Sequence, residues 1–166
     1  WFSNKPVGNQ PQFPVTVKLV TVENGVPTSN VLATSIMQCA DIITCNAATI
    51  DSANIGSNIS LNQTVNIFKF DDPVYLLPST EYAIVVYAES PYYDIWTSEA
   101  GTVDITSGQD NRLISKQPNV GNFFLSQNSS QWTPIQNYSM MFVLNKAQFD
   151  ANPVTWNFNI DPLPLN

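Results

Sequence analysis

The sequence has no histidine and very little charge. Of its 166 residues, six are lysine or arginine and 13 are aspartate or glutamate, so charged residues make up 11% and the formal net charge is −7. Without imidazole, the chain lacks the usual general base of hydrolases and a common ligand of zinc. Six basic residues, of which Arg112 is the single arginine, are too few to neutralise the phosphates of a nucleic acid or of an anionic lipid surface. We therefore expect no nucleic acid and no membrane among its partners.

Long apolar runs and cysteine clusters are also missing. No run approaches the roughly 20 apolar residues that cross a bilayer, and no signal peptide is visible. The chain starts at Trp1 rather than methionine, so we expect a mature form or a piece of a longer protein. Cys39 and Cys45 are the only cysteines, too few ligands for a structural metal site. They form either a local disulfide or two thiols, and the sequence leaves both alternatives open.

Amphipathic helical patterns are absent, and apolar residues recur with the period of β-strands instead. Residues 14–22 alternate valine and leucine with polar residues, and the Asn24-Gly25 pair that follows favours a tight hairpin turn. Residues 82–88 are nearly all β-branched or aromatic, which predicts a central strand buried on both faces. Residues 93–98 are expected to pair back with it as a hairpin. The further expected strands are residues 31–37, 64–70, 123–125, a strand at Trp132, 139–149 and 153–160.

About eight or nine short strands without a helix predict an all-β fold, an antiparallel β-sandwich whose most natural form is a jelly roll. We expect one domain over residues 1–150. Residues 38–63, rich in Ala, Asn, Ser and Asp, are expected to form a long insertion between strands, with a helical turn at 47–53. Residues 151–166 are expected to form a C-terminal strand or a connecting segment.

No set of residues in the sequence indicates catalysis or a cofactor. Asp71 and Asp72 stand next to Pro73, where the end of a strand is a better interpretation than a catalytic carboxylate pair. Together with Asp104 they are candidates for a calcium site between loops. No calcium-loop motif is present, however, so we expect no bound metal. The sequence therefore predicts a protein without enzymatic activity and without a cofactor.

Four aromatic residues are the strongest candidates for ligand binding. Tyr92, Tyr93, Trp96 and Trp132 stand in a chain rich in Asn, Gln and Ser. Aromatic rings flanked by hydrogen-bonding side chains are suited to stacking against sugar rings. The alternative, which we favour, is that these aromatics belong to the core or pack on a neighbouring subunit. Trp96 and Trp132 are the best candidates for exceptions.

Three linked blocks of the sequence resemble a known family. They read VTVKLVTVENGVPTSNVLA, FDDPVYLLPSTEYAIVVYAESPYYDIWTSEAG and ISKQPNVGNFFLSQNSSQWTPIQNYSMMFVLNKAQF, and the stretch from ISKQP to SQNSSQWTP is the most specific part. They look like a jelly-roll-type domain of the large tail and baseplate structural proteins of contractile-tailed bacteriophages, marine cyanophages among them. The likeness covers residues 13–149, with the region from Cys39 to residue 62 as an insertion of this sequence.

This resemblance implies a function and a location. It implies a structural component of the virion, in the tail, the baseplate or a fibre attachment, that acts through protein–protein contacts. Its expected partners are other virion tail proteins and copies of itself. The resemblance implies no catalytic residues. The alternative function is a carbohydrate-binding module, or a receptor-binding domain, for host-surface glycans.

Overall fold

The structure, a computed structural model, describes residues 1–45, 65–103, 113–115, 121–128, 130–140 and 142–149. Its regular elements within these residues are strands and one short 3-10 helix, and every pair of named strands runs antiparallel. The predicted all-β antiparallel fold is confirmed. The elements are β1 (Phe2–Asn4), β2 (Val15–Glu23), β3 (Val26–Met37), η1 (Cys39–Asp41), β4 (Tyr82–Ala88), β5 (Asp94–Ile95), β6 (Thr97–Glu99), β7 (Phe123–Leu125), β8 (Thr133–Ile135) and β9 (Tyr138–Met140).

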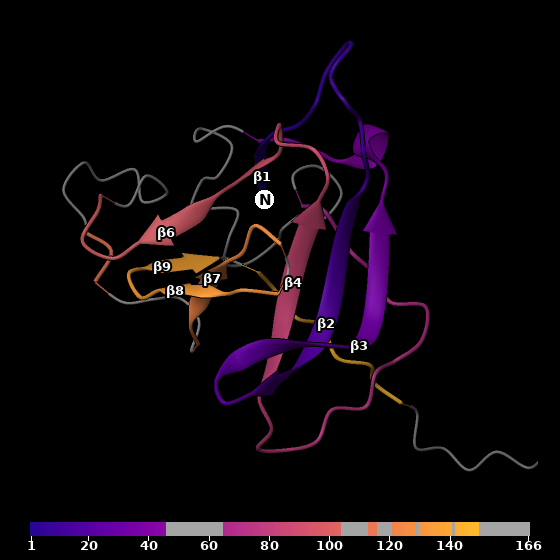
Figure 1. The fold of residues 1–166 in the computed structure, drawn as a ribbon. Helices are drawn as coiled ribbons and strands as arrows, with labels where there is room; N and C mark the ends of the chain where they lie inside the picture. The colour runs from indigo at the N-terminus through magenta and orange to yellow at the C-terminus, as the bar shows by residue number, and fades with distance from the viewer. Residues whose placement is uncertain (46–64, 104–112, 116–120, 129, 141, 150–166) are drawn as a thin grey trace, which may run out of the picture.

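The main sheet contains three strands in the order β3-β2-β4, which stand side by side on the right in Figure 1. β2 is the central strand, and its alternating sequence buries residues such as Val15 and Leu19 on one face. Asn24 and Gly25 have φ angles of 52° and 75°, the left-handed pair that a two-residue hairpin turn needs. β3 therefore folds back directly along β2. The predicted hairpin is confirmed, and its second strand starts earlier than expected, at Val26.

The strand that was expected at the centre of a sheet, β4, lies at an edge. Within the described residues β4 pairs with β2 alone, so its apolar side chains are mostly half-buried rather than buried on both faces. The prediction was wrong because β-branched and aromatic residues indicate a strand without indicating how many neighbours it has. The hairpin expected between residues 82–88 and 93–98 is also wrong, since β5 pairs with β1 and β6 pairs with β9.

Three two-stranded sheets, β1-β5, β6-β9 and β7-β8, complete the described fold. β6, β7, β8 and β9 gather on the left in Figure 1, beside the main sheet. The rings of Phe123 in β7 and Tyr138 in β9 stack with their centroids 6.4 Å apart. Asn137 Nδ2 donates a 2.9 Å hydrogen bond to Glu99 Oε1 in β6. These contacts hold β7 against β9 and the β8–β9 turn against β6.

The hydrophobic core lies at the end of the main sheet where the N-terminal strand enters. Phe2 of β1, Val15 of β2 and Ile42, which follows η1, are buried in one cluster. Each buried apolar side chain of this size contributes roughly 1.5–3 kcal/mol to stability. The cluster therefore brings segments that are distant in sequence to one end of the sheet. Half-buried residues that pack around it are Met37, Phe68, Val86, Ala88, Tyr93 and Ile95.

Two of the expected strands are shortened or not formed. Residues 65–70 lie in no strand, because Asn66 uses its side chain instead: Ile43 N donates to Asn66 Oδ1 and Asn66 Nδ2 donates to Ile43 O, both at 2.8 Å. An amide side chain can satisfy backbone groups that a strand ladder would otherwise pair. The strand expected over residues 139–149 ends at Met140, and residues 142–149 lie in no strand.

A jelly roll is not confirmed. The described strands form one three-stranded and three two-stranded sheets. Within the insertion expected over residues 38–63, the described part contains η1, whereas the helical turn expected at 47–53 lies outside the described residues. The C-terminal segment 151–166, with the strand expected over 153–160, lies outside them too.

Substitution of Leu19 by alanine tests the role of β2 as the buried centre of the sheet. Leu19 is 5% exposed, and we expect Leu19→Ala to lower the free energy of unfolding by about 2–5 kcal/mol through lost burial and a cavity. Urea unfolding followed by circular dichroism measures this change. The matched control, Leu77→Ala at an exposed position, should change stability by less than about 0.5 kcal/mol. Equal effects of the two substitutions would contradict the assigned core.

Candidate interaction surface

The loop that follows β3 is held in place by Lys5. Lys5 Nζ donates to three backbone carbonyls of this loop, those of Cys39 (3.2 Å), Ala40 (3.3 Å) and Ile42 (2.6 Å). An ammonium group has three N–H donors, so these three carbonyls can accept all the hydrogen bonds that Lys5 Nζ donates. Lys5 therefore serves the fold rather than an exposed basic surface.

Cys39 and Cys45 are thiols in the structure, the second of the two alternatives that the sequence left open. Both are buried, and their sulfurs lie 3.6 Å from two different carbonyls, Pro6 O for Cys39 and Phe2 O for Cys45. Cys45 N also donates a 2.9 Å hydrogen bond to Phe2 O. The two cysteines therefore act as small apolar residues that pack against the N-terminal segment.

Tyr93, one of the four aromatic candidates, packs against the core. Its hydroxyl donates a 2.6 Å hydrogen bond to Phe13 O, and its ring meets the ring of Phe2 edge to face with centroids 5.9 Å apart. Burial, and to a lesser extent the neighbouring Cys39 thiol, raises the pKa of Tyr93 well above its usual range. The ring and the hydroxyl of Tyr93 are thus engaged in internal contacts.

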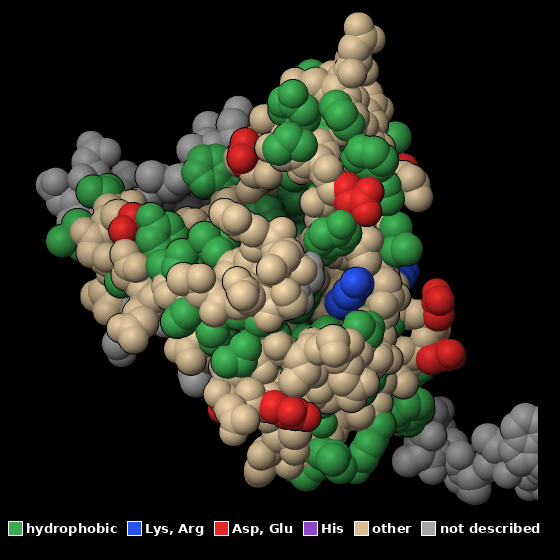
Figure 2. All heavy atoms as spheres, viewed as in Figure 1, with side chains coloured by type: hydrophobic (Ala, Val, Ile, Leu, Met, Phe, Trp, Pro, Cys, Tyr) green, Lys and Arg blue, Asp and Glu red, His purple; other side chains and the backbone are tan. Residues whose placement is uncertain are grey.

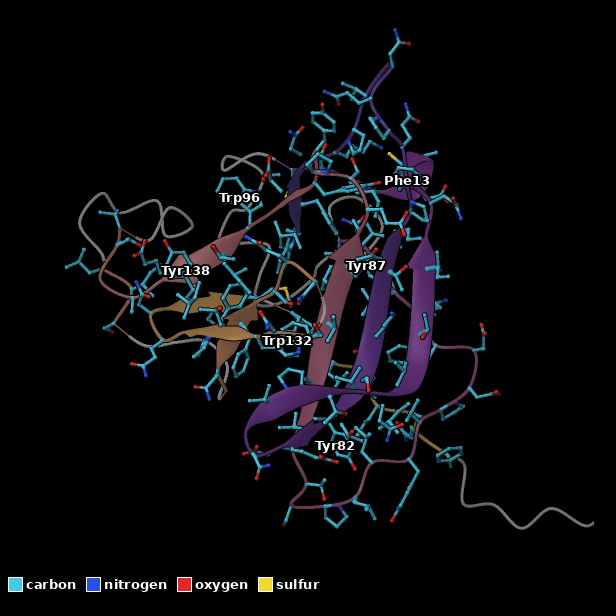
Figure 3. All side chains as sticks on the ribbon, viewed as in Figure 1. Phe13, Tyr82, Tyr87, Trp96, Trp132 and Tyr138 are labelled. Atoms are coloured by element: carbon cyan, nitrogen blue, oxygen red, sulfur yellow. The ribbon has the colours of Figure 1, made fainter. Side chains whose placement is uncertain are left out.

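The other three aromatic candidates lie on different parts of the fold. Trp96, half-buried between β5 and β6, donates from Nε1 to Cys45 O at 3.0 Å. Trp132 is half-buried directly before β8, and Tyr92 is exposed in the loop after β4. Figure 3 shows Trp96 beside β6 and Trp132 nearer to β4, so the two indole rings do not share one stacking surface. Tyr92 is the most accessible ring of the four.

Exposed apolar side chains are the most prominent feature of the surface. Within the described residues, 18 large apolar side chains are exposed, whereas eight apolar residues are buried. Figure 2 shows hydrophobic side chains in several patches over the face in view, with few charged groups between them. Apolar exposure on this scale is typical of surfaces that another protein covers. Two stretches, β3 and residues 142–149, carry eight of the 18 side chains.

β3 forms an unprotected edge of the main sheet. Its 12 residues include no charged residue, and within the described part of the chain it pairs with β2 alone. Its pairing with β2 is regular over residues 33–37, and the register shifts on both sides of the pair formed by Val20 and Val31. Long uncharged edges are uncommon in monomers because they invite pairing with another chain. We name residues 31–37, which include the exposed Leu32 and Ile36, the β3 edge.

The opposite side of the main sheet, along β4, differs in carrying charged groups. Lys18 of β2 places its Nζ 5.7 Å from the ring centroid of Tyr87 in β4, within the range of a cation–π contact. The Tyr87 hydroxyl donates a 3.1 Å hydrogen bond to Glu89 Oε1, and this bond is the main reason that the pKa of Tyr87 is raised. β4 itself contains no charged residue, so the charged groups near this edge are Lys18 on the central strand β2 and Glu89, which follows β4.

Residues 142–149, with the sequence FVLNKAQF, form the second apolar stretch, which we name the C-terminal apolar segment. The exposed fractions of Val143, Leu144 and Phe149 are 70%, 61% and 77%. No residue of the segment makes a hydrogen bond in the described part of the chain. The segment contains Lys146 and no acidic residue. Its backbone donors and acceptors are therefore available to a partner.

The acidic candidates for a calcium site do not form a cluster in the described residues. No three cysteine, aspartate or glutamate side chains in the described ranges could hold one metal ion together. Asp71 and Asp72 are exposed, and Asp104 lies outside the described residues. Separately, the described part of the chain contains no helix of the length and apolar character that a membrane span requires.

The sequence-based interpretation did not single out the β3 edge. A signal for it was present, since residues 26–37 contain no charge. What the pattern does not reveal is that β4 pairs with the other side of β2, so that β3 is the outermost of the described strands in this sheet. The C-terminal apolar segment was predicted as part of a strand, whereas in the structure it forms no strand and pairs with none of the described strands.

Replacement of Tyr93 by phenylalanine tests the internal role of this ring. The variant loses the hydrogen bond to Phe13 O, so the free energy of unfolding at neutral pH should fall by about 1 kcal/mol. In the wild type, the pKa of the Tyr93 hydroxyl is raised in the folded state. As the pH rises above about 10, this hydroxyl therefore ionises in the unfolded chain before it ionises in the folded protein. The stabilisation is present below that pH and is lost as the pH rises further. Tyr93→Phe should therefore weaken the alkaline decline in stability.

Urea unfolding at a series of pH values measures both effects of Tyr93→Phe. Tyr75→Phe, at an exposed ring, is the matched control and should leave stability within about 0.5 kcal/mol of the wild type. An alkaline decline in Tyr93→Phe as steep as that of the wild type would rule out the proposed role of this hydroxyl.

Comparisons with known proteins add no family to these observations. No protein-family model, no curated protein and no solved structure matches the chain. A function is therefore proposed from the contacts, exposure and charge of the described residues, together with the resemblance of the three sequence blocks.

Proposed function

We propose that the chain is a structural component of a bacteriophage virion, in the tail, the baseplate or a fibre attachment, that acts through protein–protein contacts. The observation that carries this proposal is the excess of exposed over buried large apolar side chains in the described residues. Exposed apolar surface of this extent is unfavourable in water, and neighbouring subunits that cover it remove this cost. The uncharged β3 edge adds backbone groups that a neighbour can pair.

The virion location is supported by the blocks that resemble phage tail proteins. In this fold the most specific block supplies a structural connection: Asn128 Oδ1 accepts hydrogen bonds from Ser130 N (3.1 Å) and Gln131 N (2.9 Å) in the turn that joins β7 to β8. An asparagine side chain that caps a turn in this way stabilises the local backbone. The residues of this block therefore fit a role in architecture better than a role in catalysis.

A host-surface glycan is the second candidate partner, and the exposed ring of Tyr92 favours it. Tyr92 is 39% exposed, and the neighbouring Asp94 is exposed as well. A ring with hydrogen-bonding neighbours can stack on a sugar. The separation of Trp96 from Trp132 and the internal contacts of Tyr93 make this the weaker candidate.

The virion role predicts that the protein is present in assembled particles. We expect the parent protein among the virion proteins identified by mass spectrometry of purified particles. We also expect antibodies raised against this chain to label the tail in immunogold electron microscopy. Particles from a strain that lacks the gene are the control for labelling. Absence of the protein from the purified particles would overturn the proposal.

The glycan alternative predicts binding on an array of bacterial surface polysaccharides that depends on aromatic stacking. Loss of one stacked ring should weaken binding by roughly 10-fold, which corresponds to about 1.4 kcal/mol. We would compare Tyr92→Ala and Trp132→Ala with Tyr75→Ala, which removes an exposed ring outside the candidate group. Binding that is absent in the wild type, or equal in all variants, would exclude this alternative.

A further inference from the structure

We propose that copies of this chain associate head to tail by strand addition, in which the C-terminal apolar segment of one copy pairs with the β3 edge of the next. The inference deepens the proposed function, on whose exposed apolar surface it rests, by naming one partner and the two surfaces that meet. Strand addition satisfies the backbone groups of an edge strand and of an extended peptide at the same time.

The acceptor is the β3 edge, whose geometry suits a short added strand. Its pairing with β2 is regular over residues 33–37, and a regular strand offers an even row of donors and acceptors to a neighbour. The first half of β3 is less suitable, because the register with β2 shifts twice between Pro27 and Ala33 and proline lacks an N–H group. A strand that pairs along residues 33–37 therefore matches the regular part of this edge.

The donor is the C-terminal apolar segment, which begins with apolar residues and pairs with no strand in the described part of the chain. Its described residues are enough to pair along residues 33–37 of the acceptor, and Phe142 and Val143 are residue types favoured in sheets. All eight residues are exposed. None of them makes a hydrogen bond in the described part of the chain, so addition to a second sheet breaks no internal bond there.

The charges of the two pairing stretches do not oppose each other. The donor segment carries Lys146 and no acidic residue. The β3 edge itself is uncharged, so no like charges oppose each other along the added strand.

The head-to-tail arrangement also uses both unpartnered stretches in every copy. A symmetric contact between two β3 edges would leave both C-terminal apolar segments exposed. A heterologous contact repeats along a series of copies, closing into a ring if the rotation between them permits and extending into a filament if it does not. Repetition of this kind suits a component of a symmetric particle.

The experiment uses the full chain in sedimentation velocity over a concentration series. We expect the wild type to exceed the monomer mass of 18.4 kDa in a concentration-dependent way. The donor variant Val143→Asp/Leu144→Asp and the acceptor variant Leu32→Lys/Ile36→Lys should each remain monomeric, because a charge would have to be desolvated on pairing. All four positions are exposed. The matched controls Val7→Asp/Leu77→Asp and Val7→Lys/Leu77→Lys, at exposed apolar positions elsewhere, should associate like the wild type.

A mixture of the two variants gives the decisive result. The donor variant keeps an intact β3 edge and the acceptor variant keeps an intact C-terminal apolar segment, so one contact can form and no second contact can follow. We expect the mixture to reach twice the monomer mass and to stop there. A wild type that stays monomeric throughout the series, or a donor variant that still associates through paired β3 edges, would overturn the proposal.

Hydrogen exchange of the wild type provides a measurement that does not depend on the variants. Amides of residues 31–37 and 142–149 should gain protection as the protein concentration rises, and constant exchange at both would count against the proposal. Failure here is distinguishable from failure of the proposed function. A monomeric chain that is found in virions refutes the self-association alone, whereas an associating chain that is absent from virions refutes the virion role alone.

Discussion

The pairing of β2 with β3 on one side and β4 on the other is the constraint on which the rest of the structure depends. It creates the one sheet in the described residues that has a buried central strand. Val15, at the end of β2, is completely buried and belongs to the cluster of Phe2 and Ile42. The N-terminal strand and the loop after β3 are placed by packing against this end of the sheet, and β5 follows because it pairs with β1.

Around this core, side-chain hydrogen bonds replace strand pairing. The ammonium group of Lys5 and the amide of Asn66 bind backbone groups of the segment after β3. The indole of Trp96 donates to Cys45 O in the same segment. Two of the four aromatic candidates for ligand binding, Tyr93 and Trp96, therefore have structural partners. A buried polar backbone group left without a partner is costly, which is the physical reason that these side chains are engaged internally.

The low charge of the chain has its clearest consequence at the surface. Near β4, the ring of Tyr87 contacts Lys18 and its hydroxyl donates to Glu89, so two charged groups lie beside this edge. The β3 edge and the C-terminal apolar segment have no such protection. Exposed strand edges and apolar segments favour association with another chain. A net charge of −7 opposes indiscriminate association, so a specific partner is favoured over aggregation.

The sequence by itself determined the all-β class, the strands β2 and β4 and the Asn24-Gly25 hairpin, because alternation and turn chemistry are local properties. Only the tertiary structure decided that β4 has one strand neighbour among the described residues, that β5 and β6 pair with β1 and β9 instead of β4, and that Tyr93 packs against the core. Strand neighbours depend on which distant segments bury apolar surface together. The β3 edge illustrates both levels, since its lack of charge is written in the sequence while its outermost position follows from the pairing of β2 with β4.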